Sequence, residues 1–161
     1  MQPKRILAFD PGFERLGVAV VERQGGRDVL IYSDCVRTKK HLPFPTRLQQ
    51  IGEAATELIK RFEPRSVALE NVYFEKNAKT AMKVAQVRGV LCFLAAKAGL
   101  EVLEYTPLEV KVAVTGYGKS DKRAVSEMVG RLVRIPPGKR LDDELDAIAI
   151  GLTGLAIGAL R

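Results

Sequence analysis

Apolar and polar residues alternate at the start of the chain in a pattern typical of extended strands. Residues 4–10 are mainly apolar and end at the Pro11-Gly12 turn. Residues 16–23 alternate between apolar and polar side chains, and residues 28–33 form a third such run after a glycine-containing turn. Three consecutive strands joined by short turns predict an antiparallel meander.

Further along, the apolar spacing becomes helical. Residues 48–62 carry apolar side chains three and four apart, and Pro64 follows them. The preceding residues 37–47 are basic and contain prolines, so we expect a mobile connection there. Residues 66–70 are a short apolar run that ends in a carboxylate, which predicts a buried strand after a crossover helix.

The rest of the chain continues this alternation of helices and strands. The expected elements are a helix over 79–98, a strand over 101–105, a helix over 108–115, a glycine-rich loop over 116–119, a helix over 121–134 capped by Ser120, and a last helix from about Asp142. Together these elements predict an α/β fold, a mixed sheet made of an antiparallel meander plus parallel strands and flanked by helices. The 161 residues suit a single domain over residues 1–161.

Positive charge is concentrated in the middle of the chain. The net charge is +7, and residues 71–140 carry 13 Lys and Arg against 6 Asp and Glu, so the whole excess lies there. Lys and Arg that neutralise phosphates release counterions and supply affinity that does not depend on sequence. This distribution favours a polyanionic partner such as nucleic acid, although a soluble protein can also be basic without one.

Nothing in the composition indicates secretion or a membrane partner. No stretch resembles a signal peptide, and the long apolar run over residues 145–160 is short for a bilayer span and contains Asp146. Cys35 and Cys92 lie far apart in ordinary apolar surroundings, which is typical of reduced thiols in a cytosolic protein. We therefore expect a cytoplasmic location.

Four carboxylates stand in apolar surroundings. Asp10 ends the first predicted strand, and Glu70 ends the strand over 66–70. Asp143 and Asp146 are three residues apart near the start of the last helix, where they share a face and where the helix dipole favours anions. All four would meet if the two strands that end at Asp10 and Glu70 lie side by side.

Such a cluster is costly unless a cation is bound, because burial and mutual repulsion both oppose the ionised forms. Mg²⁺ prefers oxygen ligands, and two such ions can activate water and stabilise the leaving oxygen in phosphodiester cleavage. Simpler interpretations remain open for three members: Asp10 as a turn residue, Glu70 as a solvated strand end and Asp143 as a helix-start charge. Asp146, inside an apolar stretch, has no comparably simple interpretation.

No other catalytic pattern competes with the carboxylates. His41 lies in a basic segment and fits a surface residue. No Cys/His cluster has the spacing of a zinc site, and no GxxxxGK[ST] loop is present. The Gly116-Tyr117-Gly118-Lys119 loop is generic, although its glycines and lysine suit contact with a DNA backbone.

Four segments resemble the RuvC family of Holliday junction resolvases. They are DPGFERLG, which begins at Asp10, ALENVYFEKNAKTAMKVAQVRG, which contains Glu70, YTPLEVKVAVTGYGKSDKRAV, and DDELDAIAIGL. The second is specific, because a strand-end Glu, two aromatic residues and Lys-Asn precede a helix that holds Gln86, Arg88 and Gly89. The chain departs from the common family pattern at Arg123, where an uncharged polar residue is more usual.

The resemblance implies an RNase H-like fold and a magnesium-dependent crossover junction endodeoxyribonuclease, with one or two ions per subunit and Mn²⁺ as a substitute. It also implies a homodimer that nicks opposed strands of a four-way DNA junction symmetrically during recombination and repair, with a branch-migration helicase complex as a further partner. The family's acidic positions correspond to Asp10, Glu70, Asp143 and Asp146. Some relatives have a histidine at the position of Asp143.

The helix after Glu70 resembles the family's dimer-forming helix. Its apolar residues equally fit a core helix, so the sequence leaves open which of them form a dimer contact: Met82, Val84, Val87, Leu91 and Leu94.

The resemblance and the charge pattern together select residues for DNA contact. Tyr73 matches an aromatic residue that stacks on a base at the open junction centre, with its neighbour Phe74 as the alternative and burial of either ring also open. Asn77 belongs to the same motif. The basic residues expected near phosphates are Lys76, Lys79, Lys83, Arg88, Lys111, Lys119 and Lys122, of which Lys111 and Lys122 match family positions.

Three other functions stay open from the sequence. One is RNA processing by the same fold. Another is an actin-like ATPase, suggested by DPG followed by GVAVV, although that fold needs two related halves and more chain. The third is a scaffold that binds junctions without cutting them.

Overall fold

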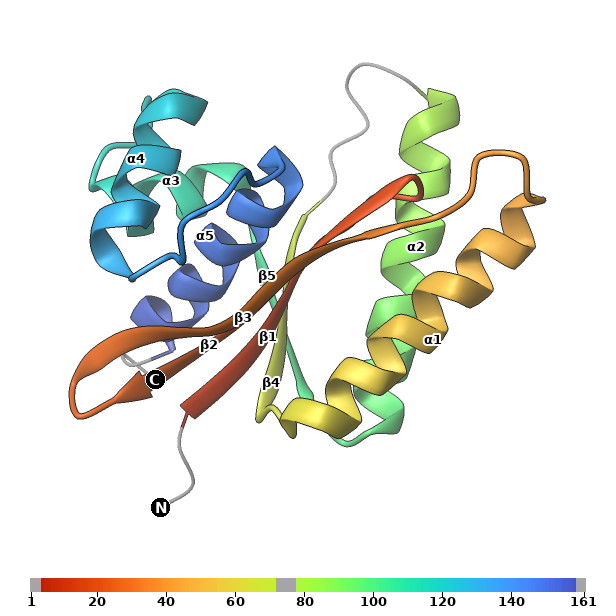
Figure 1. Ribbon diagram of the computed structural model, residues 1–161, viewed down its shortest axis with the longest axis horizontal. Coiled ribbons are helices and arrows are strands. Elements are labelled where there is room, and N and C mark those ends of the chain that lie inside the picture. Colours follow the sequence, from red (N-terminus) through yellow and green to blue (C-terminus); the bar gives the residue numbers. More distant parts are fainter. Residues whose placement is uncertain (1–3, 72–77, 159–161) are drawn as a thin grey trace.

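A five-stranded mixed sheet forms the centre of the computed structural model, which describes residues 4–71 and 78–158 (Figure 1). In sheet order the strands are β3 (Arg27–Arg37), β2 (Arg15–Gln24), β1 (Lys4–Asp10), β4 (Ser66–Glu70) and β5 (Glu101–Tyr105). β1 pairs antiparallel with β2 and parallel with β4. The predicted combination of an antiparallel meander with parallel strands is therefore confirmed.

Helices cover both faces of this sheet (Figure 1). They are α1 (Phe44–Phe62), α2 (Ala78–Lys97), α3 (Pro107–Thr115), α4 (Lys122–Leu132) and α5 (Asp142–Ile157). α1 and α2 lie on one face, while α5 packs directly on β1 and β2 from the other and contacts α3 and α4. Of the helices that the structure describes, none is both long enough and apolar enough to cross a membrane.

The alternating side chains of β1 supply two separate cores. Ile6 and Ala8 pack in the cluster beneath α5, whereas Leu7 and Phe9 pack in the cluster beneath α1 and α2. All four side chains are at most 1% exposed. Burial of each large apolar side chain stabilises the fold by roughly 1.5–3 kcal/mol, so both cores hold the strand that ends at Asp10.

α5 approaches the sheet closely at Gly151. A Cβ atom at this position would lie 2.9 Å from Cγ2 of Val21 and 3.3 Å from Cβ of Ala8. A larger residue would therefore force α5 away from β1 and β2. This close contact sets the distance between the sheet and α5, the helix whose first turns carry Asp143 and Asp146.

The segment over 37–47 differs from our prediction of a mobile connection. β3 continues to Arg37, and α1 already begins at Phe44. Arg47 is buried, and it donates hydrogen bonds to Thr38 Oγ1 at 2.8 Å and to the Phe13 carbonyl oxygen at 3.2 Å. The prediction was wrong because the basic composition included an arginine whose donors find partners inside the fold.

The start of α4 also differs from the prediction. Asp121 is the N-cap residue, and its carboxylate accepts a hydrogen bond from the Ala124 backbone N–H at 2.8 Å. Ser120, the predicted cap, instead lies 2.7 Å from Thr115 Oγ1 through its hydroxyl oxygen. Both residue types suit an N-cap, so sequence alone did not separate two adjacent candidates.

Candidate active site

Two of the four predicted carboxylates lie side by side at the carboxyl edge of the sheet. Asp10 is the last residue of β1 and Glu70 the last residue of β4. The two strands are parallel neighbours, and their register pairs Phe9 with Leu69, one residue before each acid. The pairing of β1 with β4 therefore brings together acids that are sixty positions apart.

The other two carboxylates come from the start of α5. Its first turn holds Asp142, Asp143 and Glu144, and its N-cap residue Leu141 makes no side-chain capping hydrogen bond. The free N–H groups and the dipole at a helix start favour negative charge there. Asp146 follows one turn after Asp143, and its charge acts on Asp10 and Glu70.

Gly17 permits this close approach of α5. It pairs with Asp10 across the β1–β2 ladder. A Cβ atom at position 17 would lie 1.8 Å from the Asp143 carbonyl oxygen and 3.1 Å from Cβ of Asp10. Only glycine fits between the helix start and the strand end.

Burial and neighbouring charges raise the pKa of three of these carboxylates, Asp10, Glu70 and Asp146. Burial raises the pKa of Asp10 to about 8, and the negative charges of Asp146, Glu70 and Asp143 add to the effect. Burial also raises the pKa of Glu70 and of Asp146. The four acids therefore form one electrostatically coupled cluster, which we call the carboxylate cluster.

Lys122 supplies positive charge to the carboxylate cluster. Its Nζ lies 3.0 Å from Asp146 Oδ2 and 3.7 Å from Asp142 Oδ2. Burial alone would lower the pKa of Lys122, but the hydrogen bond to Asp146 and the nearby negative charges raise it. Lys122 and Lys111 line a hollow of about 230 Å³ together with Glu70 and Asp146.

The chemistry of this cluster fits a divalent cation, because its donors are carboxylate oxygens that repel one another and burial opposes their charge. As placed, the side chains that the structure describes include no group of three or more His, Cys, Asp or Glu residues able to hold a metal ion. Metal binding would therefore require these side chains to move from the positions described.

The predicted DNA-contact residues have different surroundings. Lys79 and Lys119 are exposed. Lys83 lies over the rings of Phe13 and Phe44, with Nζ 5.1 and 5.5 Å from the ring centroids.

Arg88 donates hydrogen bonds to Asn71 Oδ1 at 3.1 Å and to Glu104. Its side chain is 22% exposed and lies beside the end of β4, and its predicted contact with DNA stays a prediction. Tyr73, Phe74, Lys76 and Asn77 lie outside the described residues.

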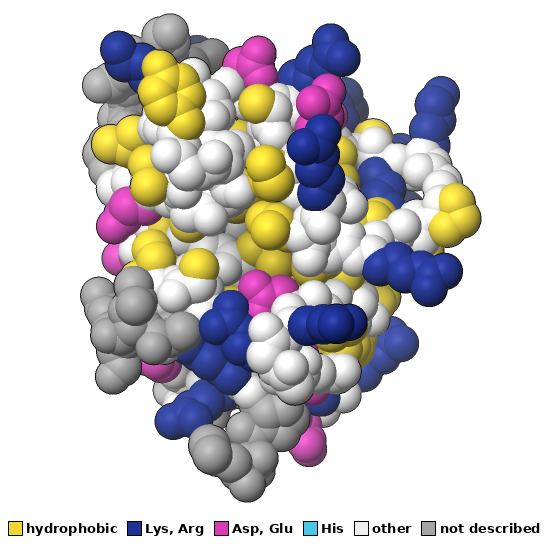
Figure 2. All heavy atoms as spheres, turned by 90° about the vertical axis from the view of Figure 1, so that its left-hand side faces the viewer, with side chains coloured by type: hydrophobic (Ala, Val, Ile, Leu, Met, Phe, Trp, Pro, Cys, Tyr) yellow, Lys and Arg dark blue, Asp and Glu magenta, His cyan; other side chains and the backbone are white. Residues whose placement is uncertain are grey.

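Figure 2 shows lysine and arginine side chains spread over the side of the molecule that carries α3 and α4, with acidic side chains between them.

Sequence reasoning missed two features beside the cluster. Gly17 stands within the DPGFERLG segment, but nothing in its pattern shows that a helix start contacts it. Arg15 in the same segment places Nη1 3.7 Å from Asp143 Oδ2. Spacing could not show either contact, because each joins residues more than a hundred positions apart.

Comparison with known proteins gives a consistent result. Residues 6–154 match the family model described as crossover junction endodeoxyribonuclease RuvC. RuvC of Brevibacillus brevis is 40% identical over 149 residues, covering 92% of this chain and 90% of that protein. RuvC of Moorella thermoacetica is 42% identical over 147 residues, covering 91% and 88%.

Solved structures agree with the sequence comparisons. The structure of T. thermophilus RuvC in complex with Holliday junction substrate superposes with a TM-score of 0.91 at 30% identity, covering 98% of this chain and 96% of that one. The yeast mitochondrial Holliday junction resolvase shares the fold, with a TM-score of 0.74 at 12% identity. The predicted RNase H-like fold is confirmed, and the chain belongs to the RuvC family of crossover junction endodeoxyribonucleases.

Proposed function

We propose that this protein is a structure-selective endonuclease that resolves four-way DNA junctions by nicking two opposed strands. The observation that carries the proposal is the meeting of Asp10, Glu70, Asp143 and Asp146 at one edge of the sheet, from three separate elements. The family membership and the junction-bound T. thermophilus relative support the choice of substrate.

Asp10, Glu70, Asp143 and Asp146 would hold Mg²⁺, or Mn²⁺ in its place. When bound, the ion would supply Lewis-acid activation of water and charge stabilisation in phosphodiester hydrolysis. The chain itself fixes where this happens, because Asp10 and Glu70 end two buried parallel strands and cannot move apart without disrupting the sheet. Asp143 is the member of the cluster that also contacts Arg15, with 3.7 Å between Arg15 Nη1 and Asp143 Oδ2.

Lys111 and Lys122 suit the positioning of the scissile phosphate. Both line the hollow that also contains Glu70 and Asp146. The Lys122 ammonium already lies beside Asp146, so an arriving phosphate would find a cation next to the acids. Lys79 and Lys119 are exposed and free to contact more distant phosphates, and the stacking role of Tyr73 and the contacts of Lys76 and Asn77 remain predictions.

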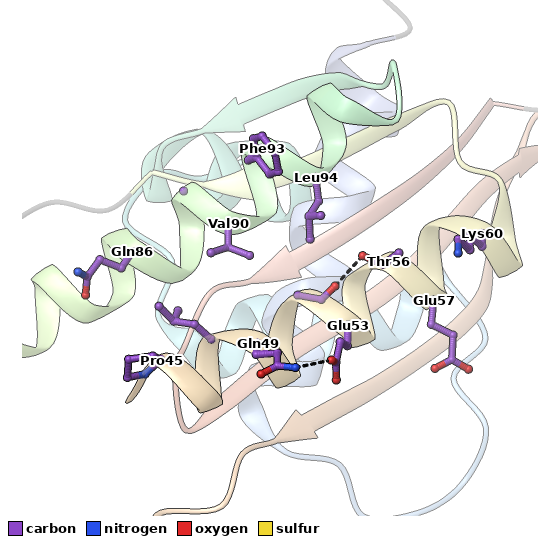
Figure 3. Close-up of a pocket in the computed structure, with 13 residues that line it drawn as sticks. Pro45, Gln49, Glu53, Thr56, Glu57, Lys60, Gln86, Val90, Phe93 and Leu94 are labelled. Atoms are coloured by element: carbon purple, nitrogen blue, oxygen red, sulfur yellow. Dashed lines mark hydrogen bonds between the residues drawn. The ribbon is translucent and has the colours of Figure 1, made fainter. Parts of the chain in front are cut away.

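A homodimer would present two such sites to a junction. Of the apolar residues of α2 that the sequence left open, Val87 and Leu91 are buried in the core, whereas Met82 is 64% exposed. Phe93, which the sequence analysis did not include, is 65% exposed. Val90, Phe93 and Leu94 of α2 line a groove of about 930 Å³ between α1 and α2, and Val90 and Leu94 point toward α1 (Figure 3). This apolar groove is the surface that we assign to the dimer; a helicase partner stays a prediction.

The test is cleavage of a synthetic four-way junction labelled on each strand, with Mg²⁺, with Mn²⁺ and with a chelator. We expect paired nicks on opposed strands when Mg²⁺ or Mn²⁺ is present and none in chelator, and the nicked ends should be substrates for ligase. Duplex DNA and structured RNA serve as controls, and preferential cutting of the RNA would overturn the choice of substrate. Tight binding without nicking under either metal would instead indicate a scaffold.

Salt dependence provides an independent check of the DNA interface. If about six phosphates are neutralised, the logarithm of the association constant should fall with the logarithm of salt concentration at a slope near −5. A slope near zero would contradict an interface built on lysine and arginine.

A further inference from the structure

A second group of cations lies beside the carboxylate cluster, on the side away from Lys111 and Lys122. Glu14, Arg15, Arg37, Thr38 and Lys40 line a surface hollow of about 340 Å³. Three of these five residues are cationic and one is anionic. They come from the start of β2, the end of β3 and the connection to α1. This group, which we call the β2–β3 cation site, includes part of the basic segment that the sequence drew attention to.

The strand order places the β2–β3 cation site next to the acids. Along the carboxyl edge, β3 and β2 lie on one side of Asp10 and β4 lies on the other. Arg15 Nη1 is 3.7 Å from Asp143 Oδ2. Burial raises the pKa of the Cys35 thiol, and the charges of Asp143, Arg37 and Arg15 all act on this thiol, so the four groups share one neighbourhood.

The pairing of Arg15 with Arg37 destabilises the fold unless another group offsets their repulsion. Arg15 and Arg37 are directly paired across the antiparallel β2–β3 ladder, so their side chains leave the same face of the sheet. Like charges in directly opposed positions destabilise a sheet. In the part of the chain that the structure describes, the Arg37 side chain has no hydrogen bond or ion pair, and both arginines are exposed.

An anion in the hollow would relieve this repulsion. Arginine presents a planar fork of donors that binds phosphate oxygens in pairs, and two such forks face one opening here. Lys40 now pairs with Glu14 at 3.5 Å, but its side chain is 81% exposed and free to turn toward a ligand. The chemistry of the site is therefore that of a phosphodiester backbone.

We propose that Arg15, Arg37 and Lys40 bind a backbone phosphate of the DNA strand that the carboxylate cluster cuts, on the opposite side of the scissile phosphate from Lys111 and Lys122. The strand is then held by cations on both sides of the acids. This assignment rests on the proposed function, and it adds a positioning site that the acids and the two lysines do not provide.

The test compares Arg15→Gln and Arg37→Gln with Arg27→Gln. Arg27 is an exposed arginine at the other end of β3, so this control removes the same charge from the same strand but far from the acids. Binding of a fluorescent four-way junction is titrated in chelator at several salt concentrations. Each site variant should weaken binding about tenfold and make the salt slope shallower by about 0.9, while Arg27→Gln matches the parent protein.

Two further variants separate phosphate binding from a structural effect. Arg37→Lys keeps the charge and should retain the salt slope. Glu14→Gln removes the anion from the hollow and should tighten binding. Thermal unfolding without DNA should show Arg37→Gln to be at least as stable as the parent, because a repulsion is removed.

The possible outcomes discriminate between the two proposals. If the parent cuts junctions but both site variants keep the affinity and slope of Arg27→Gln, the β2–β3 cation site is overturned and the proposed function stands. If the parent neither binds nor cuts junctions, both are overturned.

Discussion

The two ends of the β1–β2 pair shift the pKa of a carboxyl group in opposite directions. Glu22 pairs with Arg5 across the ladder, and its carboxylate accepts hydrogen bonds from Arg5 Nε at 2.6 Å and Gln24 Nε2 at 2.8 Å. Burial would raise the pKa of Glu22, but these partners lower it. Asp10, at the other end of the same pair, faces Gly17 and three acids, and its pKa rises to about 8.

The same contrast recurs within α5. Glu144 accepts a hydrogen bond from Ser33 Oγ at 2.6 Å and pairs with Arg140, so its charge is matched inside the fold. Asp143, one residue earlier, has among the described residues a single ion pair, the long contact with Arg15. This chain therefore matches Glu22 and Glu144 with close partners inside the fold, whereas Asp10 faces other acids, which supports the proposal of a cation site at the carboxylate cluster.

The largest expected effect is the loss of cleavage activity when Asp10, at one end of the β1–β2 pair, is replaced. Asp10→Asn should reduce metal-dependent junction cleavage by about 10³-fold or more, because it removes a charged ligand from the carboxylate cluster. Junction affinity in chelator should stay within about threefold of the parent. The measurement is single-turnover cleavage beside a binding titration, and a variant that cuts at the parental rate would remove Asp10 from the catalytic machinery.

Gly17→Ala tests the close approach between α5 and β1. The added methyl group would overlap the Asp143 carbonyl oxygen, so the start of α5 must shift. We expect a loss of about 3 kcal/mol in unfolding free energy and a cleavage rate at least about 100-fold lower. Gly130→Ala, at an exposed position where a Cβ meets no atom within 4 Å, is the matched control for both measurements.

Glu22→Gln addresses the other end of the strand pair. The neutral side chain leaves Arg5 without its ionic partner, so the free energy of unfolding should fall by about 1–3 kcal/mol in chemical denaturation. Cleavage by the folded fraction should not change. A loss of activity larger than the loss of folded protein would mean that the two ends are coupled.

The last prediction concerns how the free energy of unfolding without metal depends on pH at Asp10 and at Glu22. Because the pKa of folded Asp10 is raised from 3.8 to about 8, its ionisation opposes folding, and stability is lost as pH rises between these values. Glu22 has the opposite sign, since its lowered pKa adds stability that is lost as pH falls.

Asp10→Asn should therefore gain about 1–3 kcal/mol over the parent at pH 8 in chelator and little at pH 4. Denaturation at the two pH values measures this, and equal gains at both would contradict the electrostatic account of the carboxylate cluster.

Much of the fold follows from the sequence because its signals are local. Alternation in residues 16–23 and helical spacing in residues 48–62 each correspond to an observed element. The errors arose where a long-range partner decides the outcome. Arg47 was assigned to a mobile segment, yet its guanidinium reaches Phe13 across the fold.

The candidate site shows the same division. Asp10, Glu70 and Asp146 were recognisable because carboxylates at the ends of apolar runs are costly, and the resemblance to a family supplied their common role. Gly17 and the opposed pair of Arg15 and Arg37 carry no local signal, since their meaning comes from strand register and the docking of α5. A further residue, Arg88, has a structural environment that its basic character did not reveal.

The central place of β1 in the sheet also has a kinetic consequence. This strand is hydrogen-bonded on both edges and covered on both faces, so its amides can exchange with solvent only when the whole sheet opens. β3, in contrast, is an edge strand of the sheet, where local fraying exposes amides more often. Hydrogen exchange should therefore find the slowest amides immediately before Asp10, and the spacing of the acids should persist until global unfolding.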